Sequence, residues 1–131
     1  MTMGRLTFEF PPRSLRANSR AGAHWGTVHK DKKAYRASCV AVIESVRWGE
    51  PKPGPVPLAV IAYYGKGERM GDLSDLGFLA KTPIDCLVQC GVFENDSPAH
   101  LRPFFADCER GERSMLVILW ADDARERMRL K

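Results

Sequence analysis

The sequence has few of the features that mark secreted or membrane proteins. Its 131 residues contain no apolar run near the roughly 20 residues that a membrane-spanning helix needs. The N-terminal segment is not cationic and then apolar, as a signal segment would be, because residues 5–10 alternate instead. Internal repeats and low-complexity segments are also absent from the sequence. We therefore expect one domain over residues 1–131, located in the cytoplasm and without a membrane partner.

The spacing of the cysteines fits no common metal motif. The four cysteines include no C-x-x-C pair. Cys86, Cys90 and Cys108 could form a zinc site together with His100, but their spacing matches no common zinc pattern. Free cysteines are more often small buried hydrophobic residues, and this is the interpretation we favour. A zinc-stabilised regulatory module stays as a weaker alternative.

The hydrophobic periodicity predicts a small α+β domain. Residues that alternate at period two, or form short apolar runs, indicate strands, and apolar residues at helical spacing indicate helices. We expect strands at 5–10, 57–64, 100–108 and 114–120, and helices at 28–48 and 82–89. The order β-α-β-α-β-β favours a small mixed sheet with both helices on one face.

Several details follow from local signals. The apolar strand at 57–64 is expected at the centre of the sheet. Pro83 lacks an N–H, so we expect either a kink or a short first turn before a helix that begins at Thr82 and stops at Gly91. Gly111 in a short polar connection predicts a hairpin between the last two strands. Residues 121–131 form a charged tail, helical or frayed, that we expect to be a solvated end rather than a DNA-binding arm. The second face of the sheet needs cover, from solvent-tolerant side chains or a second subunit.

The net charge of +4 is mild, but the cations are concentrated. Residues 11–36 contain seven basic side chains and one acid, Asp31. Lysines crowd the first turns of the helix expected from Val28, where the helix dipole disfavours them. A polyanion partner such as nucleic acid would explain the cluster, and a solvated loop and helix surface is an equally open alternative.

The stretch from Asp72 to Asp96 holds the most distinctive chemistry. It contains three acids, Asp72, Asp75 and Asp96, and a lysine, Lys81. A few carboxylates that converge can bind Mg²⁺, a hard cation that keeps several waters. Alternatively the stretch is an amphipathic helix with charged ends, in which Lys81 and Asp85 form an exposed i, i+4 pair worth under about 0.5 kcal/mol.

From residue 8 to residue 120, the chain resembles the RusA-type Holliday junction resolvases, which are phage-borne endonucleases. The N-terminal loop is similar in its Pro-Pro pair and in Ser14 and Asn18. The most specific part is the pattern K-x-x-x-D-x-L-x-x-x-G-x-x-x-x-D, which begins at Lys81 and ends fifteen residues later at Asp96.

The resemblance implies a RusA-like fold, a homodimer, and cleavage of branched DNA such as a four-way junction with Mg²⁺, or Mn²⁺ in its place, in a bacterial or phage-infected cell. By position, it assigns Asp72 and Asp96 to the metal and Lys81 to the scissile phosphate. Asp75 is expected to complete the metal-binding and catalytic set. The expected DNA contacts are Arg13, Arg16, Asn18, Arg20, Lys30, Lys32, Lys33 and Lys81.

The chain also departs from the family pattern. Ser74 replaces the second aspartate of the usual D-x-D-N-L motif, and Asp75 stands where asparagine is usual. Gly71 occupies a position where arginine is common, and Asn95 replaces the first of a usual Asp-Asp pair. These departures leave a second hypothesis open, a RusA-like protein that binds DNA junctions without cutting them.

Overall fold

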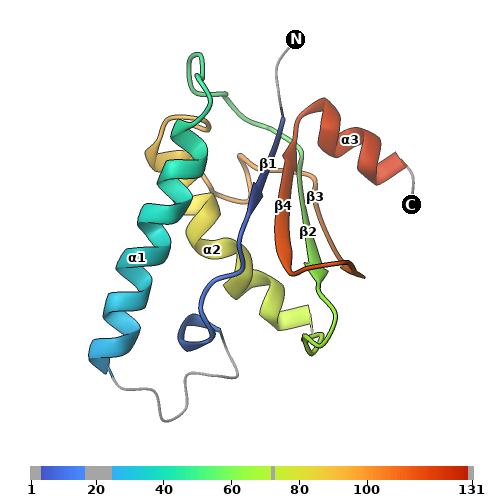
Figure 1. The fold of residues 1–131 in the computed structure, drawn as a ribbon. Helices are drawn as coiled ribbons and strands as arrows, with labels where there is room; N and C mark the ends of the chain where they lie inside the picture. Colours follow the sequence, from blue (N-terminus) through green and yellow to red (C-terminus); the bar gives the residue numbers. More distant parts are fainter. Residues whose placement is uncertain (1–3, 17–24, 72, 130–131) are drawn as a thin grey trace.

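Four strands form one mixed sheet in the order β1-β4-β2-β3 (Figure 1). The computed structural model describes residues 4–16, 25–71 and 73–129. The strands are β1 (Arg5–Phe8), β2 (Leu58–Tyr64), β3 (Phe104–Arg110) and β4 (Met115–Trp120). Strands β2 and β3 run parallel, while β4 is antiparallel to both β1 and β2. The predicted α+β class and mixed sheet are confirmed.

Strand β2 lies inside the sheet, as its apolar sequence predicted. Val60 pairs with Ile118 of β4 on one side and with Ala106 of β3 on the other. The predicted hairpin between the last two strands is therefore wrong, because β2 separates β3 from β4. The glycine at 111 marks a tight connection, but a local signal cannot show that a third strand lies between the two that it joins.

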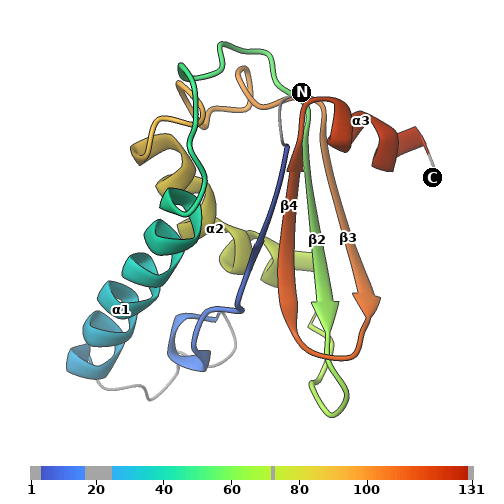
Figure 2. The ribbon, with the colours of Figure 1, turned by 45° about the horizontal axis from the view of Figure 1, so that its top comes forward.

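Two helices, α1 (Trp25–Glu44) and α2 (Leu73–Gln89), cover one face of the sheet, as expected (Figure 2). Their apolar sides meet the sheet in a core that includes the fully buried Phe8, Ile43, Leu87 and Trp120. None of the helices in the described ranges is long and apolar enough to cross a membrane.

The bounds of α1 differ from the prediction at both ends. The helix starts at Trp25 rather than Val28, so Lys30, Lys32 and Lys33 lie in its second and third turns. The conflict with the helix dipole is weaker there, since the effect fades beyond the first turn. The helix ends before Trp48, whose indole N–H donates to the Ile43 carbonyl at 2.8 Å and whose ring packs 5.6 Å from that of Trp120.

Helix α2 is continuous from Leu73 to Gln89 and contains Pro83, so of the two alternatives for this proline the helix start at Thr82 is wrong. Burial of Leu76, Leu79 and Leu87 outweighs the hydrogen bond that proline removes. The predicted stop is confirmed, because Gly91 has a φ of 81° and closes a Schellman motif in which the Val92 N–H donates to the Leu87 carbonyl at 2.9 Å.

The C-terminal tail is helical over its described residues, as one of the two alternatives predicted, but it is not a solvated end. It forms α3 (Asp122–Arg129), which packs against the second face of the sheet. Ala124 is fully buried there, and Met128, four residues further, packs against the same cluster. Arg127 forms ion pairs with Asp107 and Glu109 of β3. The sequence analysis missed this contact, because most residues of the tail are charged and its apolar side consists of few residues.

Candidate metal and nucleic-acid site

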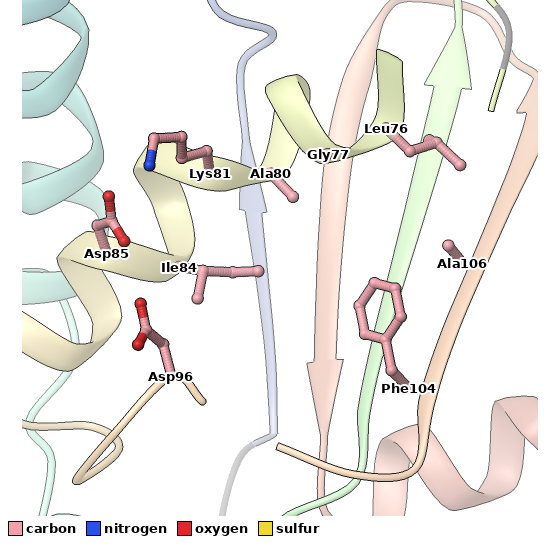
Figure 3. Close-up of a pocket in the computed structure, with 9 residues that line it drawn as sticks. All are labelled: Leu76, Gly77, Ala80, Lys81, Ile84, Asp85, Asp96, Phe104 and Ala106. Atoms are coloured by element: carbon pink, nitrogen blue, oxygen red, sulfur yellow. The ribbon is translucent and has the colours of Figure 1, made fainter. Parts of the chain in front are cut away.

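A pocket of about 480 Å³ lies between α2 and β3 (Figure 3). One part of it is charged and the rest is apolar or small. The lining residues are Leu76, Gly77, Ala80, Lys81, Ile84 and Asp85 of α2, Asp96 of the loop that follows, and Phe104 and Ala106 of β3.

The charged end of the pocket is formed by Lys81, Asp85 and Asp96. Lys81 and Asp85 are four residues apart on one side of α2, and Figure 3 shows Asp96 near them at the same end of the pocket. None of the three belongs to any ion pair found in the described ranges, so the pair between Lys81 and Asp85 that we considered as an alternative is not formed. Two carboxylates and an ammonium group thus face the same pocket without neutralising one another at close range.

Asp96 is held in place by anchors on both sides of its loop. Before it, Phe93 is buried and packs edge-on against Trp120, with 5.4 Å between ring centroids. After it, the His100 ring contacts the Lys52 carbonyl at 3.0 Å. The Asn95 side-chain oxygen accepts a hydrogen bond from the Ser97 N–H at 2.8 Å, an Asx turn that an aspartate could also form. Asn95, which departs from the RusA-type pattern, therefore forms a local turn that an aspartate at this position could form as well.

Asp75, at the front of the acidic stretch, lies in a different environment from Asp96. It is 9% exposed and does not line the pocket. Its carboxylate lies against the backbone of Gly71, where an added Cβ would come within 2.0 Å of Oδ2. Asp75 also acts on the thiol of Cys108. Burial raises the pKa of this thiol most, the negative charge of Asp107 raises it further, and the charge of Asp75 adds the smallest increase. The structure thus explains why a larger residue than glycine would not fit at position 71.

Asp72 lies outside the described residues. Within residues 4–16, 25–71 and 73–129, no three His, Cys, Asp or Glu side chains form a group that could hold a metal ion. The predicted convergence of Asp72, Asp75 and Asp96 therefore stays a prediction.

The loop that leads into α2, residues 65–71, is fixed by two arginines from distant parts of the chain. Arg110 donates from Nη1 to the carbonyls of Gly65 and Glu68 at 3.0 and 2.6 Å. Arg16 pairs with the Glu68 carboxylate at 2.5 Å and lies over the ring of Phe10, with 5.2 Å between Cζ and the centroid. Arg16, predicted as a DNA contact, therefore already has an anionic partner within the protein.

The basic segment and this loop lie at the same end of the molecule. The short helix η1 (Arg13–Leu15) is tied to α1 by a hydrogen bond from the Ser14 hydroxyl to Asp31 at 2.6 Å. Figures 1 and 2 both place η1, the start of α1 and the loop before α2 at one end. The predicted DNA contacts that are exposed there are Arg13, Lys30, Lys32 and Lys33. Asn18 and Arg20 lie outside the described residues.

The zinc alternative finds no support in the described residues, which form no group of three metal ligands. All four cysteines are free thiols. Cys86 is buried, with its sulfur 3.9 Å from the Arg36 carbonyl, and burial raises its pKa. His100 is engaged with Lys52, as described above. Cys39 is also buried, and burial raises its pKa to about 12.

Two of the pocket residues that were absent from the predicted site are Asp85 and Phe104. Asp85 was noted in the sequence without a role, and the structure places it beside Lys81 and Asp96. Phe104 was missed, although it is 59% exposed at the start of β3. The sequence did carry a signal for it, since adjacent residues of a strand point to opposite faces and Phe104 and Phe105 cannot both enter one core. No protein-family model matches this chain, and a search of curated proteins also finds no match.

Proposed function

We propose that this protein is a Mg²⁺-dependent endonuclease that cuts branched DNA, with a four-way junction as its expected substrate and a homodimer as its working form. The observation that carries the proposal is the pocket that Lys81, Asp85 and Asp96 line together, with no ion pair to any of them among the residues that the structure describes. The resemblance of residues 81–96 to the RusA-type pattern adds support from the sequence.

The residues at the charged end suit a divalent cation and a phosphate. Mg²⁺ is commonly bound through one or two carboxylates plus substrate phosphate, which matches Asp85 and Asp96, with Asp72 as the expected third acid. When bound, such a metal polarises a phosphoryl oxygen and lowers the pKa of its water. Lys81 holds a phosphate oxygen and offsets the negative charge that develops during cleavage. Asp75 stays outside this proposed ligand set because it is buried away from the pocket.

The exposed cations at the end of the molecule where α1 starts provide the wider DNA surface. Each phosphate contact releases counterions, so binding should weaken steeply with salt. Lys32→Ala should reduce the slope of log affinity against log salt by about one. Arg47→Ala is the matched control, because Arg47 is also exposed but lies beyond the C-terminal end of α1, away from its start. Equal slopes for wild type and Lys32→Ala would remove Lys32 from the DNA surface.

The direct test is incubation of an end-labelled four-way junction with Mg²⁺ or Mn²⁺. Wild type should produce symmetric nicks, and Asp96→Asn should bind the junction without nicking it. Glu94→Gln controls for the loss of a charge in the same loop, since Glu94 is exposed and does not line the pocket. Sedimentation of the free protein tests the homodimer. If no nick forms with either metal, the endonuclease proposal is wrong.

A second candidate is a protein that binds junctions without cutting them. One observation favours it: Asp75, the acid expected to replace the carboxylate missing at Ser74, is buried against Gly71. The same incubation separates the two, because this candidate predicts junction binding that is independent of Asp96 and yields no nicks.

A further inference from the structure

We propose that the apolar part of the pocket binds an unstacked nucleobase, with Phe104 as its stacking surface, next to the phosphate held by Lys81. This inference rests on the proposed function, since it takes DNA as the ligand. It adds a base-binding site to a pocket whose charged end alone would hold only phosphate and metal.

Phe104 is the first observation. It is 59% exposed, although its neighbour Phe105 packs against the cluster on the other face of the sheet. Figure 3 shows its ring at the rim of the pocket, across from Lys81 and Asp85. An aromatic ring in this position offers a flat surface to a base, and stacking on aromatic side chains is a sequence-tolerant way to bind unpaired nucleotides.

The remaining walls leave room for a ring. Gly77, Ala80 and Ala106 have little or no side chain, and Ile84 adds an apolar surface between them and the charged end. The volume of about 480 Å³ lies within the range of roughly 300–1,000 Å³ that is usual for small-molecule sites. A planar apolar group therefore fits better here than a second charged group would.

The charged end determines which planar group we expect. In a DNA strand, a base and its phosphate are joined through one sugar, so a strand whose phosphate meets Lys81 brings a base to the adjacent wall. Releasing a base costs unstacking and unpairing energy, and we expect this cost to be lower at a branch point, where the helix is interrupted, than within a continuous duplex. A base pocket beside the phosphate site would therefore make the protein select branched DNA over duplex.

The test is a double-mutant cycle on junction affinity, in which one change removes a base from the DNA and the other removes the Phe104 ring from the protein. Junctions that carry one abasic nucleotide, placed in turn at each position around the branch, are titrated with wild type and with Phe104→Ala. The titrations are done in Ca²⁺, after a control incubation has established that no nick forms with this metal. At one position, wild type should lose about tenfold in affinity when the base is removed. Phe104→Ala should show the same loss on the intact junction, with no additional loss on the abasic one.

Two variants define the controls. Phe104→Trp keeps an aromatic surface and should retain the effect of the base. Phe78→Ala removes an aromatic ring that is 41% exposed on α2 but does not line the pocket, and it should leave junction affinity unchanged. Thermal unfolding of each variant establishes that it is folded.

The outcomes separate this inference from the proposed function. Independent losses from the ring and the base, at every position, overturn the base pocket even if the junction is cut. A dimer that becomes a monomer in Phe104→Ala also overturns it, because the ring would then belong to a subunit interface. A coupled loss in a protein that never nicks DNA would support the base pocket and reject the endonuclease.

Discussion

The two ends of the acidic stretch use their charges in opposite ways. At the front, Asp75 is buried against Gly71, and the loop before it is tied down by Arg16 and Arg110. At the back, Lys81 and its neighbouring acids line an open pocket and form no ion pair in the part of the chain that the structure describes. Charges that are already satisfied inside a protein support its fold, whereas charges that converge on a pocket are available to a ligand.

This contrast separates stability from activity. Changes at the front should alter the free energy of unfolding, because they disturb a packed and hydrogen-bonded loop. Changes at the back should leave that free energy almost unaltered and act on DNA cleavage instead. A variant that violates this division would show that the two ends form one unit.

The largest effect is expected from Lys81→Met. Removing one preorganised group that stabilises charge in a transition state typically costs about 10²- to 10³-fold in rate, and we expect a loss of this size in junction cleavage. The free energy of unfolding should change by less than about 0.5 kcal/mol, as for other surface substitutions. Arg47→Met, which removes an exposed cation beyond the C-terminal end of α1, is the matched control and should retain activity. Equal losses in both variants would mean that Lys81 contributes only general positive charge.

The next effect concerns two glycines on either side of Asp75. Gly71→Ala should destabilise the protein by about 1–3 kcal/mol, because its Cβ would meet Asp75 Oδ2 at 2.0 Å. Gly77→Ala should instead stabilise it by about 0.5–1 kcal/mol, since Gly77 lies within α2 and a Cβ there meets nothing within 4 Å. Urea unfolding measures both. If Gly71→Ala were as stable as wild type, Asp75 would be able to leave its position, and the front of the stretch would not be fixed.

A smaller effect is expected at the Arg16–Glu68 pair, which joins the N-terminal segment to the loop before α2. Both side chains are about one-fifth exposed, at 22% and 21%. A double-mutant cycle with Arg16→Met and Glu68→Gln should give a coupling free energy of about 1 kcal/mol in unfolding. The pair Lys66–Glu112, exposed at 82% and 90%, is the control and should show almost no coupling. Equal coupling in the two pairs would contradict the idea that Arg16 fixes the loop.

The sequence predicted the secondary structure well where periodicity was strong. The continuous apolar run of β2 predicted its central place in the sheet. The apolar residues at helical spacing in α1 and α2 predicted that both helices pack on the sheet. The hairpin and the solvated tail were wrong because both depend on tertiary neighbours. The hairpin is excluded because strand β2 lies between β3 and β4. The tail packs on the sheet because Ala124 and Met128 contact the apolar cluster there while the neighbouring Arg127 pairs with an acid of β3.

The site was predictable in part for the same reason. The sequence could bring Lys81, Asp85 and Asp96 together, because the first two lie one turn apart on one helix and the third follows the glycine that ends this helix. Phe104 could not be assigned to the pocket from the sequence, because it lies far from α2 along the chain. It comes next to α2 through the parallel pairing of β3 with β2, which the sequence did not predict. Nor does sequence reveal that Asp75 turns toward Gly71, which depends on the path of the preceding loop.

The smallest expected effect tests where Asp75 points. Burial, then Asp107, then Asp75 raise the pKa of the Cys108 thiol above its usual value. Asp75→Asn removes one of these negative charges, so the pKa of Cys108 should fall and its thiolate fraction at a given pH should rise. Because the thiolate is the reactive form, alkylation of Cys108 at pH 8 should become faster. Cys90 is the internal control, since its raised pKa arises from burial and Glu44 and not from Asp75. Faster alkylation of both thiols would indicate general loosening of the fold, and an unchanged rate at Cys108 would mean that the Asp75 charge does not act on this thiol.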